Sequence, residues 1–357
     1  MKGLGTRSLA FPTHQGNMDM FQKLLLLACL TASWLTPAWG STLDKVRTSG
    51  SLNCGVVATP EDWNKTDLHG PLAPLNMEFC KAVAVAVLGV KAKVQLKPYA
   101  TELEAEEGLS KSVVDLVVGV TPEPTAMWHW NIAFGPAVFY DGQGFLVRHD
   151  AHASSVADLA GKRVCTVEGT DNEKILLART VARGIPIIPM PFQEEGEMDD
   201  GLAVRHCDAI SAYISRLTQV KIAYVKQVGK DDILHDLLTL SPVAPAYRRD
   251  DPQWGMIVDW TIHSLIQAEE SGVTQANVNA QRASEDPVVQ RLLGVDSATS
   301  RALGLEDHCW ATKVIAVVGN YGEIYDRTVG LHGELRLPRG LNALWLNGGL
   351  IHPLPVQ

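Results

Sequence analysis

The chain has 357 residues, of which 46% are hydrophobic and 20% are charged, and its formal net charge is −9. This composition is typical of a globular protein and excludes collagen-like, low-complexity and disordered chains. The length predicts about two domains, each large enough for its own hydrophobic core. Because the charge is negative and no basic stripe offsets it, nucleic acid is not an expected partner.

The N-terminal segment has the pattern of an export signal. Lys23 precedes an apolar run over residues 24–35, and small residues follow that run. This order predicts a signal peptide over residues 1–40 that is cleaved near Gly40–Ser41. The run is shorter than the ~20 residues that a transmembrane helix needs, and no later segment approaches that length. We therefore expect an exported protein.

The exported part contains the cysteines Cys54, Cys80, Cys165, Cys207 and Cys309, and export permits disulfides. Two local bridges, Cys54–Cys80 and Cys165–Cys207, would each join one α/β unit, although the sequence alone permits other pairings. Cys309 is then left as a free thiol or an intermolecular link. The chain has no C-x-x-C motif, so structural zinc and thioredoxin-type chemistry have no support.

After residue 40 the sequence alternates between strand and helix patterns. The continuous apolar run 113–120 is typical of a central parallel strand, and the acidic run 102–107 is typical of a solvated helix face. Pro122 and Pro124 are expected to shape a turn. The expected strands are 52–57, 94–96, 113–120, 144–148, 163–167, 187–190 and 209–211, and the expected helices are 75–87, 102–109, 171–183, 194–205, 254–270, 275–283 and 310–327. Such alternation predicts parallel sheets with helices on both faces, in two lobes with a cleft between them.

Several separate stretches of the sequence resemble one known family. They are Asn53–Gly55, Glu78–Ala84, Tyr140–Phe145, Ala268–Glu270, Val318–Asp326 and Arg339–Trp345. Over essentially all of residues 43–357, the chain resembles the family 3 extracellular solute-binding proteins of ABC importers, in particular the general L-amino-acid-binding subgroup. The resemblance implies an α/β fold of the type II periplasmic binding protein class, with two lobes, a ligand cleft and two hinge strands. It also implies disulfides at Cys54–Cys80 and Cys165–Cys207.

The resemblance further implies the domain organisation and the partners. Lobe 1 would take residues 41–146 and 243–357 and lobe 2 residues 147–242, with hinge strands near 145–148 and 242–247. Members of the family are periplasmic, close two lobes over a small-molecule ligand and dock on a membrane permease. The resemblance therefore predicts an amino acid or an amine-like molecule as ligand. It predicts no enzymatic activity, no cofactor and no metal.

The expected ligand chemistry departs from that of the family. A zwitterionic amino acid needs an arginine for its carboxylate and an acidic residue for its ammonium group. The family's arginine would fall at Ala126 or Met127, and no Arg or Lys occurs between Lys111 and Arg148. The family's ammonium-binding aspartate is replaced by Tyr213. We therefore expect a ligand that is not an ordinary α-amino acid.

The candidate ligand contacts come from both predicted lobes. The turn with Gly169 and Thr170 keeps the family's helix start, with Thr170 or Asp171 as the cap, but Asp171 adds negative charge there. The candidate ligand-binding residues are Trp63, Thr121, Glu123, Met127, Trp128, Gly169, Thr170, Asp171 and Tyr213. Together with Trp130, their aromatic and acidic side chains favour a cationic ligand held by cation–π contacts. The alternative is that several of these aromatic side chains pack in the core.

Three other interpretations stay open. A periplasmic enzyme of the dehydratase type, on the same fold, would use Glu123 or His129 as general acid, although such enzymes tend to keep the missing arginine. The motifs G-x-S-x-G and H-E-x-x-H are absent. A homologue that has lost its ligand would serve as a sensor or scaffold. A metal site at His149–His152 has poor spacing, and these histidines are expected in a surface loop.

Overall fold

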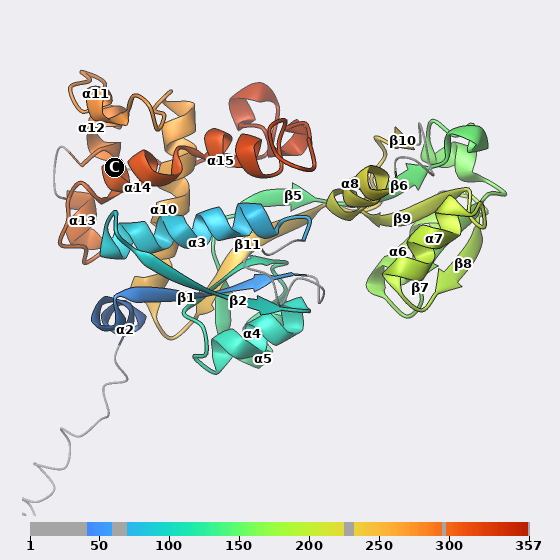
Figure 1. The fold of residues 1–357 in the computed structure, drawn as a ribbon, viewed down its shortest axis with the longest axis horizontal. Helices are drawn as coiled ribbons and strands as arrows, with labels where there is room; N and C mark the ends of the chain where they lie inside the picture. The colour runs from blue at the N-terminus through green and yellow to red at the C-terminus, as the bar shows by residue number, and fades with distance from the viewer. Residues whose placement is uncertain (1–40, 59–69, 225–231, 295–297, 356–357) are drawn as a thin grey trace, which may run out of the picture. The chain divides into compact units, whose positions relative to one another are not determined.

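The computed structural model describes residues 41–58, 70–224, 232–294 and 298–355, which form two β-sheets with flanking helices (Figure 1). The predicted signal peptide and Trp63 lie outside the described residues. Within those ranges, no helix combines the length and the apolar character needed to cross a membrane.

The first sheet has the strand order β2-β1-β3-β11-β4, and β5 pairs with β11. Its strands are β1 (Ser51–Val57), β2 (Lys93–Tyr99), β3 (Leu116–Val120), β4 (Ile132–Phe134), β5 (Phe139–Asp141) and β11 (Ser241–Arg248). β1 runs parallel to β2 and β3, whereas β11 is antiparallel to β3, β4 and β5. β3 is almost entirely buried, as expected for a central strand that is covered on both faces.

Helices from both ends of the chain cover this sheet (Figure 1). They are α2 (Thr42–Ser49), α3 (Ala73–Leu88), α4 (Glu102–Ser110), α5 (Pro124–Trp130), α10 (Pro252–Glu270), α11 (Val278–Gln281), α12 (Pro287–Leu292), α13 (Ala298–Ala302), α14 (Trp310–Val318) and α15 (Tyr321–Thr328). The largest core joins α3, α10, α14 and α15 to β1, with Phe79, Trp254 and Tyr321 fully buried in it. A smaller core lies between α4, α5 and the sheet.

The second sheet has the order β10-β6-β9-β7-β8. Its strands are β6 (Gln143–Val147), β7 (Arg163–Val167), β8 (Ile188–Phe192), β9 (Ala209–Tyr213) and β10 (Asp232–Ile233), and its helices are α6 (Asp171–Ala182), α7 (Glu195–Ala203) and α8 (Ile214–Ala223). β7 is parallel to β8 and β9, whereas β6 is antiparallel to β9 and β10. Successive residues of β6, Phe145 and Leu146, enter two different cores, because side chains alternate between the faces of a sheet. α6 covers one core, and α7 and α8 cover the other.

The two mixed sheets correct the expectation of purely parallel ones. In the part of the chain that the structure describes, the chain leaves the first sheet after β5, enters the second with β6, and returns to the first with the antiparallel strand β11. Gly142 alone separates β5 from β6, and a side chain there would collide with the carbonyl oxygen of Thr239. β6 pairs wholly within the second sheet. The predicted lobe boundaries at 146/147 and 242/243 stay predictions.

Most expected elements are present, but three differ for local reasons. The expected helix 310–327 is two helices, because Gly319 ends α14 with a φ of +75° and Asn320 caps α15 through a capping box. Pro124 does not shape a turn; it begins α5, where a missing backbone N–H costs nothing. Within residues 275–283 only the single turn α11 is helical.

Both expected disulfides are present in the structure. Cys54–Cys80 joins β1 to α3 with a Cα–Cα distance of 6.1 Å, and Cys165–Cys207 joins β7 to the segment before β9 at 5.8 Å. Cys309 is a free cysteine whose sulfur accepts a hydrogen bond from the Arg282 guanidinium at 3.4 Å. Each bridge therefore joins two segments that belong to the same sheet and its covering helices.

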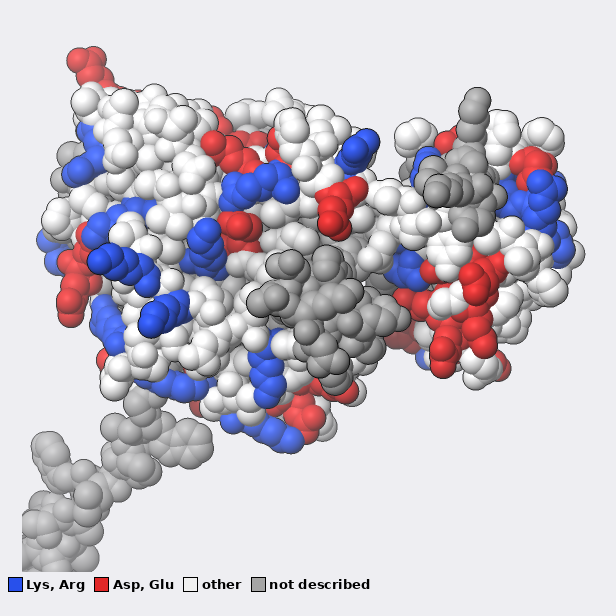
Figure 2. Space-filling model, viewed as in Figure 1, with Lys and Arg blue, Asp and Glu red and all other residues white. Residues whose placement is uncertain are grey.

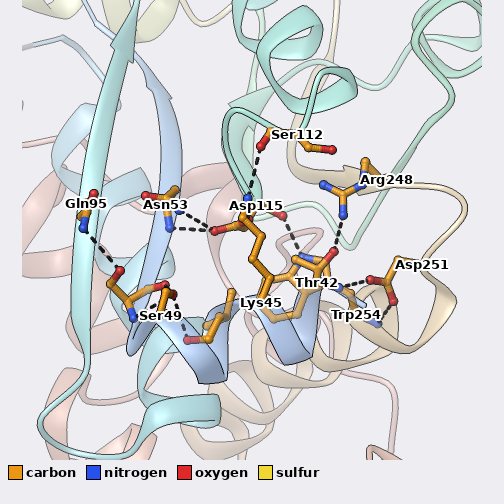
Figure 3. A network of polar contacts seen from close by, with 12 residues as sticks. Thr42, Lys45, Ser49, Asn53, Gln95, Ser112, Asp115, Arg248, Asp251 and Trp254 are labelled. Carbon is orange, nitrogen blue, oxygen red and sulfur yellow. Dashed lines mark hydrogen bonds and ion pairs between the residues drawn. The ribbon is translucent and has the colours of Figure 1, made fainter. Parts of the chain in front are cut away.

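A buried carboxylate positions the start of β3 (Figure 3). The side chain of Asp115 is fully buried and pairs with the Lys45 ammonium of α2 at 2.7 Å. It also accepts hydrogen bonds from the backbone and side-chain N–H groups of Asn53, both at 3.0 Å. The Trp254 indole donates to the Asp115 carbonyl at 2.8 Å. These contacts fix α2, β1 and α10 against the strand whose other end leads to the candidate site.

The carboxyl-terminal motifs meet at Arg339. Its guanidinium lies 5.1 Å from the ring centre of Tyr321 and 4.8 Å from that of Tyr325, and it pairs with Glu269 at 3.1 Å. A planar cation between rings and a carboxylate gains both cation–π and ionic attraction. The motifs 268–270, 318–326 and 339–345 are therefore parts of one packed cluster.

Candidate functional site

The carboxyl end of β3 is bonded to the start of α4. Thr121 follows β3, and its backbone N–H and hydroxyl donate to the Glu102 carboxylate at 2.8 and 3.2 Å. Burial raises the pKa of Glu102, and these two hydrogen bonds partly offset that effect. Thr121, a predicted ligand contact, therefore holds Glu102 in place within the chain.

Glu106 lies one turn further along α4 and is only 6% exposed. This burial corrects the expectation that residues 102–107 form a solvated face. Burial raises the pKa of Glu106 to about 7, and the carboxylates of Glu102 and Glu123 add to the rise. Each of these three carboxylates is thus close enough to affect another electrostatically.

α5 carries the third carboxylate and the aromatic side chains of this region. Glu123 is exposed at the N-terminus of α5, and Thr125 donates to it at 3.3 Å. Trp128 is 86% exposed, whereas Trp130 packs against the core between α4, α5 and the sheet. Met127 is half-buried. Trp130 therefore packs against the core, as the alternative interpretation of these aromatic residues expected, whereas Trp128 is accessible to a ligand.

Tyr213 connects this acidic region to the second sheet. It ends β9, precedes α8 and is the register partner of Gln143. Its hydroxyl hydrogen bonds with Ser241, and burial is the largest cause of its raised pKa. Glu102 and Glu123 raise that pKa further, which means that both carboxylates lie within electrostatic range of the phenol. The structure thus brings Tyr213 near residues predicted from the first lobe.

The helix start at Gly169–Asp171 is already bonded to an internal carboxylate. Thr170 is the N-cap of α6 and accepts the Glu173 N–H at 3.3 Å. Gly169, with a φ of +76°, donates its N–H to the Glu173 carboxylate at 2.7 Å. Asp171 is exposed and pairs with Lys174 at 2.8 Å. Two acidic side chains therefore surround a helix N-terminus, where a ligand carboxylate would otherwise be stabilised.

Acidic groups extend beyond that turn. Figure 2 shows them gathered over α6 and α7 on the face in view. Arg148, the first guanidinium after residue 111, is bound to Asp150 at 2.9 Å and to the Cys207 carbonyl at 3.2 Å. Among the described residues, no group of three His, Cys, Asp or Glu side chains is arranged to hold a metal ion. The side chains of this region are thus mainly acidic, and the nearest arginine is already paired.

Sequence reasoning missed three carboxylates of this region: Glu102, Glu106 and Glu173. A signal was present for Glu173, because Thr170-Asp171-Asn172-Glu173 has the T-x-x-E spacing of a capping box. For Glu102 and Glu106, the acidic run concealed the face that α4 turns inward, since burial depends on what the helix packs against.

The two mixed sheets, linked by the β5–β6 crossing and returning through β11, define a type II periplasmic binding protein fold. No family model matches the chain. It is 34% identical to the general L-amino acid-binding periplasmic protein AapJ of Rhizobium johnstonii, over 92% of this chain and 97% of that protein. It is 33% identical to the glutamate/glutamine/aspartate/asparagine-binding protein BztA of Rhodobacter capsulatus, over 93% and 97%.

A solved structure gives the same result. An ABC transporter periplasmic binding protein from Brucella ovis, with glutathione bound, is 31% identical, has a TM-score of 0.76, and matches over 89% of this chain and 100% of its own. The chain belongs to the periplasmic solute-binding proteins of amino-acid ABC transporters. It is thus a periplasmic protein that takes a small-molecule ligand and serves a membrane permease, and the family resemblance is confirmed.

Proposed function

We propose that this solute-binding protein captures a small cationic molecule, an amine or guanidinium compound, and that Glu102, Glu106 and Glu123 provide the attraction. The observation that carries the proposal is the coupling of these three carboxylates, in which each acidic neighbour raises the pKa of Glu106. Bringing a cation to such a cluster relieves the repulsion between the carboxylates. A ligand ammonium or guanidinium would also form charge-assisted hydrogen bonds with them.

The remaining contacts are proposed for the predicted site residues. The phenol of Tyr213 and the exposed indole of Trp128 supply aromatic faces of the kind that attract cations. Asp171 and Glu173 at the start of α6 disfavour a free carboxylate on the ligand. Thr121 and Gly169 act by holding acidic side chains, and Thr170 acts as the N-cap of α6.

The site residues are proposed to bind and not to catalyse. The named relatives at 32–34% identity are binding proteins, which supports a transport role over the dehydratase alternative. A bound ligand should accordingly be recovered unchanged after prolonged incubation with the protein. Turnover of any ligand would contradict this part of the proposal.

A second candidate ligand comes from the Brucella ovis relative, which is recorded with glutathione. Glutathione carries one ammonium group and two carboxylates, so it would need cationic partners that the stretch between Lys111 and Arg148 lacks. Glutathione is therefore an explicit competitor in the test of the proposed function.

The decisive experiment is calorimetric titration of the purified protein with putrescine, agmatine, arginine, glutamate and glutathione. We expect putrescine or agmatine to bind at least tenfold more tightly than glutamate or glutathione. Glu106→Gln and Glu123→Gln should each weaken that binding about tenfold or more, because each removes one charge-assisted contact.

Glu107→Gln is the matched control. Glu107 lies beside Glu106 on α4, but its side chain is 42% exposed and paired with Lys111, so its substitution should leave the affinity unchanged. Micromolar or tighter binding of glutamate, or of glutathione without amine binding, would refute a cationic ligand. The absence of binding by every compound would instead favour the ligand-less sensor or scaffold alternative.

A further inference from the structure

The structure contains a cavity that is not lined by the three carboxylates of the proposed ligand site. It has a volume of about 740 Å³ and is lined by the β5–β6 crossing, α8, the segment after β10, α15 and residues 334–342. It is lined by none of the eight predicted site residues that the structure describes. Its size falls within the usual range for small-molecule sites, about 300–1,000 Å³.

Most of the cavity wall is apolar. Ile214 and Ile222 contribute one side from α8, Leu237 lies after β10, and Leu337 and Leu341 face them from the carboxyl-terminal segment. Concave apolar walls of this kind exclude water and bind the hydrocarbon part of a ligand. The occupant must therefore have an apolar body.

The wall also contains charged side chains of both signs. Lys221, Arg336 and Arg339 line the cavity against two carboxylates, Asp141 and Glu334, although the whole chain is acidic. Asp141 is buried and already accepts the Ser215 hydroxyl at 2.5 Å and the Gly142 N–H at 2.8 Å. Asp141 is therefore already satisfied by internal donors, and Glu334 is the exposed carboxylate of the wall.

Two of the three cations have partners, and the third does not. Arg339 pairs with Glu269 at 3.1 Å, and Lys221 pairs with Asp232 at 3.4 Å. Arg336 is exposed and has no acidic partner among the described residues, and its backbone has the left-handed φ of +51°. Such a φ is uncommon for a non-glycine residue.

We propose that this cavity is a second ligand site, which takes an organic anion with an apolar body, with Arg336 as the main partner of the anionic group. The apolar walls bind the hydrocarbon part, and Arg336 and Lys221 attract the carboxylate or sulfonate. This proposal is independent of the cationic ligand at the acidic cluster.

The test is a fluorescence titration of the purified protein with 8-anilinonaphthalene-1-sulfonate, followed by competition with decanoate and with uncharged decanol. We expect saturable binding of one dye molecule, displaced by both competitors, with decanol about fivefold weaker. An exposed charge contact contributes up to about 1 kcal/mol, which corresponds to about fivefold. Arg336→Gln should remove that preference for decanoate without changing the affinity for decanol.

Ile222→Trp fills part of the cavity from α8 and should weaken dye binding at least tenfold. Val181→Trp is the matched control, because Val181 is an exposed aliphatic residue of α6 that does not line the cavity. If Ile222→Trp fails to fold, as judged by circular dichroism, Leu341→Trp fills the cavity from the opposite wall. No dye binding, or equal effects of Ile222→Trp and Val181→Trp, would overturn the proposal; equal affinity of decanoate and decanol would overturn the choice of an anion.

Discussion

The burial of Glu106 makes the stability of the protein depend on pH. Substitution of this residue by glutamine should remove that dependence. Its pKa is about 7 in the folded chain against an ordinary value of 4.5. One pKa unit is about 1.4 kcal/mol, so this difference corresponds to about 3 kcal/mol of unfolding free energy. Because the folded pKa is the higher one, this stability is fully present below pH 4.5 and is lost as the pH rises through 7.

Glu106→Gln keeps the size of the side chain and removes its titration. The free energy of unfolding of the variant, relative to that of the unchanged protein, should therefore rise by about 2–3 kcal/mol as the pH increases from 4.5 to 8.5. Urea unfolding followed by circular dichroism at pH 4.5, 6, 7 and 8.5 measures this gain. Glu107→Gln, which loses only an exposed ion pair, should differ by at most about 0.5 kcal/mol throughout. A stability difference for Glu106→Gln that does not vary with pH would refute the reasoning.

Four further outcomes are expected. Amine affinity should increase from pH 6 to 8 and lose this dependence in Glu106→Gln, because a bound cation displaces the proton of that carboxyl. Replacing Cys54 and Cys80 together by alanine should cost about 3.5 kcal/mol in urea unfolding, the loop-closure value for a separation of 26 residues. Asp115→Ala should cost about 3–5 kcal/mol, since it leaves buried donors without their acceptor. Arg339→Ala should cost about 2 kcal/mol, because it removes the cation from between two rings and a carboxylate.

Each of the stability predictions has its own control. Cys309→Ala removes a free thiol and should leave the unfolding free energy within about 0.5 kcal/mol. Asp250→Ala removes an exposed carboxylate that lies 3.8 Å from Arg248 and should cost less than about 1 kcal/mol, unlike Asp115→Ala. Arg339→Lys keeps the charge but not the planar stack, so it should recover only part of the loss. A cost below about 1 kcal/mol for Asp115→Ala would show that the buried network is not important for stability.

The start of β3 and the direction of β11 could not be predicted from hydrophobic patterns. The apolar run 113–120 correctly predicts a central strand, but β3 begins only at Leu116, because the run starts in the turn that closes α4, where the Val113 N–H donates to the Gly108 carbonyl at 2.9 Å. Likewise, alternating patterns cannot reveal that β11 runs antiparallel to β3. Strand direction depends on the end of the sheet at which the chain returns, and that is a property of the whole topology.

The sequence by itself determined most of the helices and strands and the absence of any Arg or Lys between Lys111 and Arg148, and its resemblance to a family implied the class of the chain and both disulfides. These features are local, since they rest on periodicity, short motifs and residue types at known spacing. The tertiary structure alone decided that Glu106 is buried beside Glu102 and Glu123 and that Trp130 packs in a core while Trp128 does not. Burial and charge coupling depend on which elements pack together in space, and the order of residues along one helix does not contain that information.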